Sequence, residues 1–168
     1  MRRIFGVFAV AAVLAGLTGQ AALASNGLYI TTNDKEHNLA DLTATGNGNA
    51  LSIVQSYDGL GDANALTVSL DGDLNGGQLG AAFGGLPAKL GLVPGSVQQT
   101  GHGNTVGLSV TGSSNLFAMS QIGVSNSVIG SIIGNNNQVA VIQRGMGNSL
   151  SFTQNGTGNM LSVVQQSR

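Results

Sequence analysis

Six asparagines recur at intervals of eleven residues between position 104 and the end of the chain. Glycine follows the asparagine by eight positions in the first five of these units, and glutamine follows it by six positions in four of the six. Val110 and Ile132 replace the glutamine in the other two. A fixed period indicates a repeat architecture, so one structural unit has to account for every copy. The asparagines are Asn104, Asn115, Asn126, Asn137, Asn148 and Asn159.

The repeat unit predicts a strand followed by a tight turn. An eleven-residue period also fits three turns of helix, but each glycine within a helix costs about 1 kcal/mol relative to alanine. Between the glycines the residues alternate: Asn148, Leu150, Phe152 and Gln154 share one face, and small polar residues lie between them. The glycine-containing residues that follow allow a backbone turn with positive φ.

These units predict an all-β fold, a β-solenoid of stacked strand-turn repeats with about 11 residues per unit and two units per rung. A single strand-turn-strand unit cannot bury its apolar face alone, whereas stacked rungs about 4.8 Å apart can. Asn104, Asn126 and Asn148 are expected to line one corner of the solenoid. The other three asparagines of the series are expected to line the opposite corner.

The inward amides predict ladders that run along the stack. A buried amide is costly unless it is paired, and identical amides on successive rungs satisfy each other by donating one way and accepting the other. The predicted ladder residues are Asn49, Gln55, Asn104, Asn115, Gln121, Asn126, Asn137, Gln143, Asn148, Gln154, Asn159 and Gln165. The predicted turn glycines are Gly101, Gly112, Gly123, Gly134, Gly145 and Gly156.

The chain begins with the pattern of a secretory signal peptide, predicted over residues 1–24. Arg2 and Arg3 precede an apolar run, and Ala24 ends a small-x-small cleavage pattern. A membrane anchor is the alternative, but the run is shorter than the roughly 20 residues that a span needs. A twin-arginine export signal is a further alternative. The mature protein is therefore expected to be secreted.

Residues 25–37 carry no repeat signature and are predicted to form an exposed leader, within which residues 28–32 could be a short strand. The repeat domain is predicted over residues 38–168, weakly at Asn38 and clearly from Asn49. An insertion around residues 58–62 shifts the next unit to Asn64. The register breaks at about residues 79–94, where Pro87 and Pro94 indicate a loop or a distorted rung.

Composition excludes several classes of function. The chain has no cysteine, so no disulfide supports the fold. Without Arg2 and Arg3, four of the six basic residues remain against seven acidic ones, a net charge of −3 that does not suit a nucleic-acid surface. No carboxylate side chain follows Asp73, and no serine sits in a nucleophile elbow, so an enzyme is not expected.

One half-motif resembles part of a calcium loop. Asp71, Asp73 and Asn75 stand at positions one, three and five and Gly76 at six, but Ala82 occupies the position of the bidentate glutamate. A solvated turn is the favoured interpretation, and no metal or cofactor is expected. His37 and His102 have no cysteine or histidine neighbours that would suggest a zinc site.

The repeat resembles the curlin repeat of bacterial curli subunits. Gln143-Arg-Gly-Met-Gly-Asn148 through Gln154 carries the pattern of glutamine, two glycines, asparagine and glutamine, and the next unit repeats it through Gln165. The resemblance covers about residues 38–168. It implies a secreted subunit of extracellular amyloid fibres that serve adhesion, surface colonisation and biofilm matrix. It also implies periplasmic chaperones, an outer-membrane secretion pore and other curli-like subunits as partners.

The chain departs from the usual pattern in three respects, which leave open whether it is a major subunit or a nucleator. Both strands of a rung begin with asparagine, the middle breaks the repeat, and two units lack the glutamine. Two rival hypotheses remain. One is a monomeric secreted solenoid adhesin with flat Ser/Thr faces, and the other is an enzyme on a β-helix scaffold, which would need clustered carboxylates.

Overall fold

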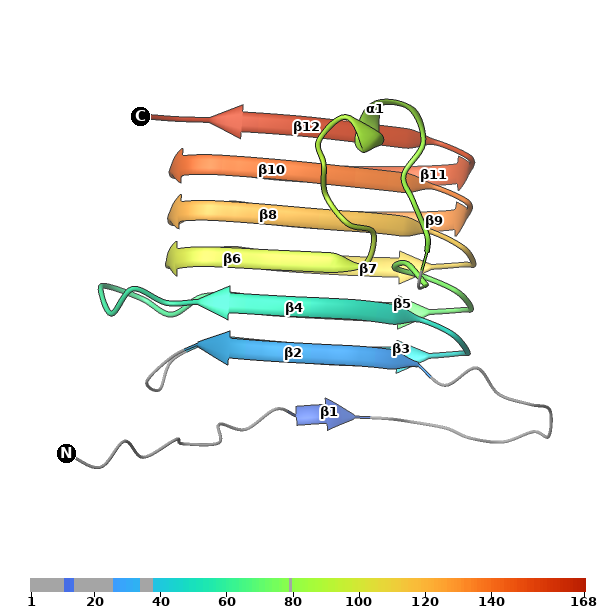
Figure 1. Ribbon diagram of the computed structural model, residues 1–168, viewed down its shortest axis with the longest axis horizontal. Coiled ribbons are helices and arrows are strands. Elements are labelled where there is room, and N and C mark those ends of the chain that lie inside the picture. The colour runs from blue at the N-terminus through green and yellow to red at the C-terminus, as the bar shows by residue number, and fades with distance from the viewer. Residues whose placement is uncertain (1–10, 14–25, 34–37, 79) are drawn as a thin grey trace.

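The chain forms a β-solenoid of two parallel six-stranded sheets that face each other across a narrow core (Figure 1). The computed structural model describes residues 11–13, 26–33, 38–78 and 80–168. Successive strands alternate between the sheets, so each strand pairs with the strand two places along the chain. The predicted fold class is therefore confirmed.

Sheet A contains the odd-numbered strands and sheet B the even-numbered ones. Sheet A consists of β1 (Ala11–Val13), β3 (Leu39–Thr45), β5 (Ala65–Asp71), β7 (Thr105–Thr111), β9 (Ser127–Asn135) and β11 (Ser149–Thr157). Sheet B consists of β2 (Gly27–Asn33), β4 (Ala50–Ser56), β6 (Ser96–His102), β8 (Leu116–Val124), β10 (Gln138–Met146) and β12 (Met160–Gln166).

The strands form because apolar residues alternate with small polar ones. Counting the corner asparagine as position zero, positions two, four and six point inward. In β5 these are Leu66, Val68 and Leu70, each at most 1% exposed. Their equivalents from the other strands complete one continuous core between the sheets. Burying such aliphatic side chains is the main stabilising term of the fold.

Two residues in each described corner turn adopt positive φ, for different reasons. At Gly123 φ is 122°, and a Cβ there would collide with the carbonyl oxygen of Gly145 on the next rung, so only glycine fits. Two residues later the backbone is in the left-handed region, where Ser125 (φ 54°) and Asn136 (φ 56°) are tolerated. This difference explains why the first turn position of the regular repeat units is glycine, whereas serine or asparagine can occupy the second.

The irregular middle is an insertion within one strand of a rung. Asn75 and Gln99 are 24 residues apart (99 − 75), whereas Asn49 and Gln55 are six apart (55 − 49), so this rung carries 18 additional residues. Gly76 bridges to Leu116 at position one, and the parallel register resumes by position three, where Ser52 pairs with Ser96. The prediction of a loop or distorted rung at residues 79–94 is refined to an insertion at 77–94, and we call these residues the strap.

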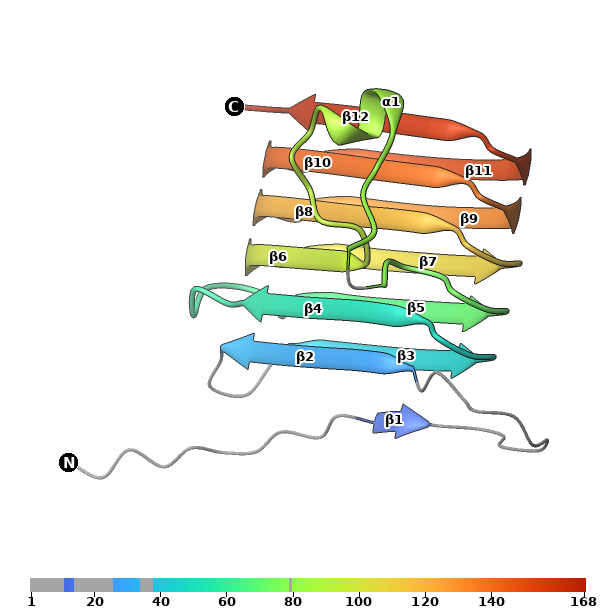
Figure 2. The same cartoon turned by 45° about the vertical axis from the view of Figure 1, so that its right-hand side comes forward.

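The strap lies on the outer face of sheet B (Figures 1 and 2). Phe83 is 8% exposed and packs with Ala118 and Ala140 on that face in a second, smaller apolar cluster. The short helix α1 (Gly85–Ala88) packs against β12 and, to a lesser extent, β10. The strap therefore reaches from the middle of the stack to its C-terminal rung.

At the N-terminal end, part of the predicted leader belongs to the solenoid. Gly27–Asn33 forms β2 and pairs with β4, and Leu28 and Ile30 pack against the core. The exposed-leader prediction is wrong for these residues, because pairing with β4 makes them the first strand of sheet B. The alternative of a short strand at residues 28–32 is correct. Most of the predicted signal peptide and residues 34–37 lie outside the described residues. Within the predicted signal peptide, Ala11–Val13 forms β1, which pairs with β3.

Candidate functional site

Asparagine ladders run along both corners of the solenoid. At the first corner, the backbone N–H and Nδ2 of Asn115 donate to Oδ1 of Asn75 at 3.1 and 3.0 Å, and Asn137 donates to Asn115 in the same way. Each Nδ2 also donates to a glycine carbonyl on the next rung, as from Asn115 to Gly134 at 2.8 Å. The first corner column consists of Asn26, Asn49, Asn75, Asn115, Asn137 and Asn159.

The second corner repeats this geometry. Nδ2 of Asn126 donates to Oδ1 of Asn104 at 3.0 Å and to the carbonyl of Gly145 at 3.0 Å. The second corner column consists of Asn38, Asn64, Asn104, Asn126 and Asn148. The asparagines predicted to share a corner therefore do so, and an interior asparagine such as Asn126 links three rungs through one side chain.

A glutamine ladder runs through sheet B at position six. Nε2 of Gln99 donates to Oε1 of Gln121 at 2.9 Å, and Gln121 donates likewise to Gln143 at 2.9 Å. The ladder consists of Gln55, Gln99, Gln121, Gln143 and Gln165. All five nitrogens donate toward the C-terminal end or across the core, so the ladder has a direction.

The same glutamines tie the two sheets together. Nε2 of Gln121 also donates to the carbonyl of Thr105 at 2.9 Å, and Nε2 of Gln143 donates to the carbonyl of Ser127 at 2.9 Å. Both acceptors are the first residues of sheet A strands. Each glutamine therefore satisfies a strand-end carbonyl across the core in addition to its ladder partner.

Gln154 does not belong to a ladder, which corrects the prediction. It lies at position six of sheet A, where its neighbour in register is Ile132. Its Oε1 is buried and accepts no hydrogen bond within the described residues. The preceding residues of this column are Ala44, Leu70, Val110 and Ile132. Among the described residues, sheet A therefore has aliphatic side chains at position six, except on its last strand, which carries an amide.

Five ladder residues were absent from the predicted set. Asn64, Asn75 and Gln99 are fully buried and hold central ladder positions. Gln99 stands 22 residues before Gln121, so the regular spacing does point to it. The spacing does not reveal Asn64 and Asn75, because the insertion at residues 58–62 and the strap lengthen their intervals to 26 and 40 residues. Asn26 and Asn38 begin the two columns in a stretch without turn glycines.

The predicted turn glycines occupy the corners. Gly101, Gly112, Gly123, Gly134, Gly145 and Gly156 all have φ between 98° and 122°. Their carbonyls are the acceptors for the corner asparagines, as for Gly112 with Asn75 at 2.7 Å. Glycine and asparagine therefore act together at the corners. The glycine permits the close approach of successive rungs, and its carbonyl accepts a hydrogen bond from the asparagine side chain.

The C-terminal rung presents unfilled acceptors. β11 and β12 are the last strands of their sheets. Oδ1 of Asn148 and Oδ1 of Asn159 receive no hydrogen bond from the part of the chain that the structure describes, whereas the equivalent oxygens of Asn126 and Asn137 each accept two. This end of the stack therefore has the ladder geometry of an interior rung without the rung that would follow.

The half-motif at residues 71–76 forms a corner. The side chain of Asn75 is fully buried in the first corner column, and Oδ1 of Asp73 accepts the N–H of Asn47 at 2.7 Å. Among the described residues, no group of three or more His, Cys, Asp or Glu side chains lies close enough to hold a metal ion. Oδ1 of Asp73 and Oδ1 of Asn75 are thus engaged in hydrogen bonds at the corner.

A surface hydrogen bond joins two turns at the second corner. Nδ1 of His102 lies 3.0 Å from Oδ2 of Asp58. This hydrogen bond lowers the pKa of the Asp58 carboxyl below its ordinary value. The imidazole also packs over Gly61, where a Cβ would approach to 2.7 Å. His102 therefore holds the inserted loop at residues 58–62 against the turn between β6 and β7.

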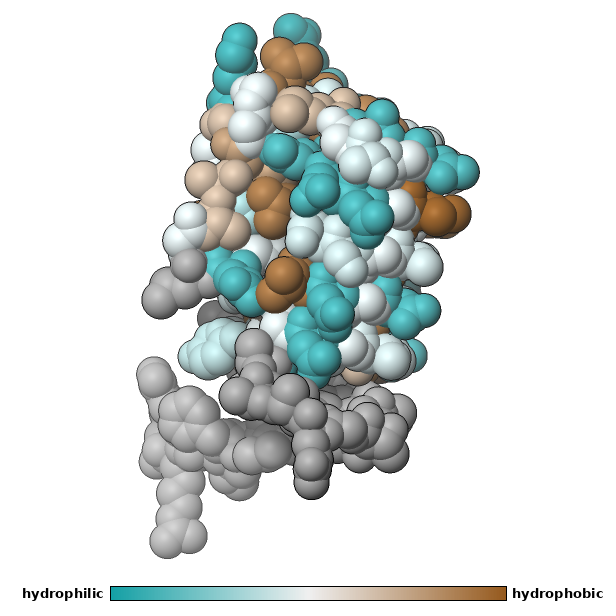
Figure 3. All heavy atoms as spheres, turned by 90° about the vertical axis from the view of Figure 1, so that its right-hand side faces the viewer, coloured by the Kyte–Doolittle hydropathy of each residue, from teal (hydrophilic) through white to brown (hydrophobic). Residues whose placement is uncertain are grey.

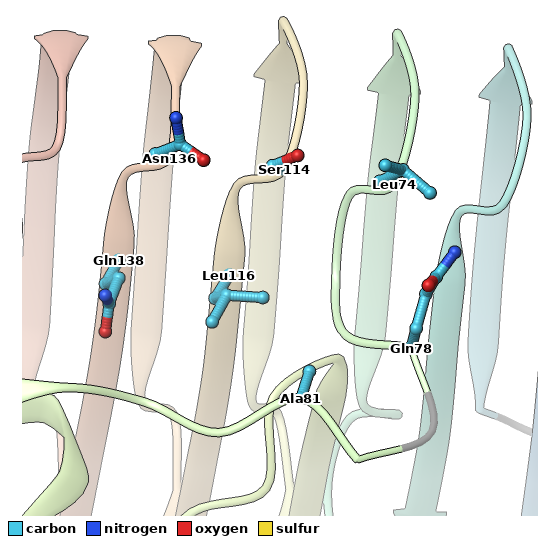
Figure 4. Close-up of a pocket in the computed structure, with 7 residues that line it drawn as sticks. All are labelled: Leu74, Gln78, Ala81, Ser114, Leu116, Asn136 and Gln138. Atoms are coloured by element: carbon cyan, nitrogen blue, oxygen red, sulfur yellow. The ribbon is translucent and has the colours of Figure 1, made fainter.

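A shallow hollow of about 310 Å³ lies between the start of the strap and the first corner (Figure 4). Gln78 and Ala81 of the strap face Leu74, Ser114 and Asn136 of the corner turns. The lining has no charged side chain, and the surface of this corner is mostly hydrophilic or neutral (Figure 3). The hollow offers no constellation for catalysis.

In comparisons with known proteins, neither a family model nor a curated protein matches the chain. Among the described residues, no helix is long and apolar enough to cross a membrane. The distinctive feature of the described chain is a set of amide ladders that end at an open rung.

Proposed function

We propose that this chain is a structural subunit of extracellular curli-like amyloid fibres for adhesion, surface colonisation and biofilm matrix. Copies assemble by end-to-end stacking of solenoid rungs. The observation that carries the proposal is the open C-terminal rung. There, Oδ1 of Asn148 and Oδ1 of Asn159 accept no hydrogen bond from the described residues. A row of unpaired strand groups of this kind is a template for another chain.

The N-terminal rung supplies a matching surface. It begins with Asn26 and Asn38, which head the two corner columns. Continuing the parallel register would place β2 of the next copy on β12 and β3 on β11. Apolar inward residues would then stack on apolar inward residues, since Leu28 would lie on Leu161. Core and corner ladders would continue through the junction at the ordinary strand spacing of about 4.8 Å.

The same proposal includes the export route that the sequence suggests. Residues 1–24 act as a signal peptide, and an outer-membrane pore and periplasmic chaperones handle the chain by analogy with curlin-repeat proteins. Other curli-like subunits, major or nucleator, are its partners outside the cell. Pairing of β1 with β3 would block one edge of the first rung, so removal of residues 1–24 favours assembly.

A monomeric solenoid adhesin is the second candidate, and one observation favours it. The outer face of sheet A carries a hydroxyl at position five on five successive strands. These residues are Thr43, Ser69, Ser109, Ser131 and Thr153. A flat, regular row of this kind suits a repetitive surface, and it needs no self-assembly.

The test is to dilute the chain beginning at Ser25 from denaturant and follow thioflavin fluorescence, with the full chain in parallel. Growth of fibres with reflections near 4.7 Å and about 10 Å is expected. Fibre growth that requires the open rung supports the subunit hypothesis. A β-rich monomer that stays soluble at high concentration would contradict it and favour the adhesin.

A further inference from the structure

We propose that the strap is a clasp between successive copies, in which α1 at the C-terminal rung of one copy covers Tyr29 on the first rung of the next. This inference rests on the proposed function, because it requires rungs to stack end to end. It adds a contact on the outer face of sheet B, outside the ladders and the core. The occupant of the patch beside α1 is a second copy of this chain.

The outer face of sheet B is built to seat the strap. Position three of its strands forms a column of small residues, in which Ala118 and Ala140 are fully buried beneath Phe83. Ser52, Ser96 and Ser162 occupy the same column on other strands. Small side chains let the strap lie close to the sheet, and the buried apolar contacts fix it there.

The strap extends as far as the last strand of the sheet. The N–H of Gly84 donates to Oε1 of Gln138 on β10 at 2.7 Å. One residue later, a Cβ on Gly85 would lie 2.7 Å from Sδ of Met160 on β12, so α1 sits directly against the terminal strand. Leu86 is 60% exposed there, and Met160 is 51% exposed. An apolar patch thus lies at the outer edge of the open rung.

Tyr29 is the one large residue in the position-three column, and it lies at the opposite end of the stack. It is 68% exposed on β2, the first strand of sheet B. If β2 of the next copy pairs with β12 in the same register, Tyr29 lies beside Ser162 and diagonal to Met160. Diagonal neighbours on one sheet face are within reach of an aromatic side chain. Its ring then comes close to α1, which packs against β12 at Met160.

The two patches cannot meet within one copy. β2 and β12 are separated by five strand spacings in sheet B, or about 24 Å at ~4.8 Å each. Leu86 and Tyr29 lie on the same face of the same sheet, at its two ends. End-to-end stacking is the arrangement that brings both exposed side chains into contact and removes their apolar surface from water.

Cysteine cross-linking tests the contact, because the natural chain contains no cysteine. The full chain carrying Tyr29→Cys and Leu86→Cys is assembled under reducing conditions, in parallel with the same variant beginning at Ser25, and then treated with a short bismaleimide. We expect a ladder of covalent multimers on a denaturing gel. The matched control carries Leu39→Cys and Leu86→Cys, since Leu39 is 59% exposed on the first rung, close to the 68% of Tyr29, but belongs to sheet A. The control should give no ladder.

Tyrosine fluorescence gives a second measurement without altering Tyr29. The chain has two tyrosines and no tryptophan, so Tyr57→Phe leaves Tyr29 as the reporter. Quenching by acrylamide should fall several-fold on assembly. Adding Leu86→Ala should restore much of the quenching while leaving fibre growth intact.

The outcomes separate the two proposals. Fibres with the multimer ladder and protected Tyr29 support the clasp. Fibres without either signal, or with an equal ladder from the control, overturn the clasp and leave the fibre function standing. Absence of fibres from the unaltered chain overturns the fibre function, and the clasp with it.

Discussion

Gln121 donates to Gln143 on the next rung at 2.9 Å while the same nitrogen donates to the carbonyl of Thr105 across the core at 2.9 Å. Both glutamines are fully buried. One side chain therefore links successive rungs and joins the two sheets, and this double role explains why a glutamine stands where an ordinary core would have an aliphatic residue. The amide is satisfied here only because its neighbours in the column are also glutamines.

Replacing Gln121 with valine is expected to lower the free energy of unfolding by about 2–3 kcal/mol, because Oε1 of Gln143 and the carbonyl of Thr105 lose their donor. Urea denaturation of the soluble monomer measures the effect. The matched control is Ile132→Val at the same position of sheet A, which should cost about 1 kcal/mol. Equal losses would mean that the ladder adds nothing beyond packing.

The corner glycines give a second prediction. Gly123→Ala places a Cβ against the carbonyl of Gly145 at a φ of 122°, so a loss of at least about 2 kcal/mol is expected. Gly147→Asn is the control, because nothing lies within 4 Å of its added Cβ and its φ of 67° suits asparagine. Thermal unfolding should separate the two variants clearly. A tolerated alanine at position 123 would contradict the close approach of the rungs.

The fold was largely predictable because the rungs are in strict register. Residues 22 apart lie above one another, so the spacing of Asn104, Asn126 and Asn148 alone predicts a corner column. The absence of a glutamine partner for Gln154 could also have been predicted, since Ile132 stands 22 residues before it. A ladder requires the same amide on the adjacent strand of the same sheet, and a repeat pattern read along the chain does not distinguish the two sheets.

The strap and the first rung were harder to predict. An 18-residue insertion breaks the period within a strand, so Asn75 and Gln99 do not look like members of one rung until the register is seen on both sides. β2 has Thr32 where a glutamine would stand and lacks preceding turn glycines. In both places tertiary pairing decides the structure, and local pattern does not.

The Asp58–His102 pair predicts a modest dependence of stability on acid. The pKa of Asp58 is lowered in the folded chain, so its contribution is fully present above the ordinary carboxyl pKa and is lost as the pH falls through the lowered value. The melting temperatures of the natural chain and Asp58→Asn should therefore differ at pH 5 and converge at strongly acidic pH. Because the Asp58 carboxylate is exposed, high salt should also reduce the difference. A difference that persists in strong acid would contradict this origin.

The open rung gives the prediction that bears most directly on assembly. Gln154 is an inward side chain on the terminal rung, and its Oε1 accepts no hydrogen bond within the described residues. In a monomer, Gln154→Lys can extend its ammonium group out of the open end into water, so folding should be retained. In a stack, the next copy would bury that charge against Ala44 without a partner, at a cost of several kcal/mol.

Fibre growth of Gln154→Lys should therefore slow by at least about tenfold, since 1.4 kcal/mol is a factor of ten. Thr153→Lys is the matched control, because it adds the same charge one residue away on the exposed outer face of β11. Thioflavin kinetics at equal concentration compare the two, and circular dichroism of the monomers shows that both fold. Equal growth rates would mean that copies do not stack on this rung, because the substituted side chain would then stay in water.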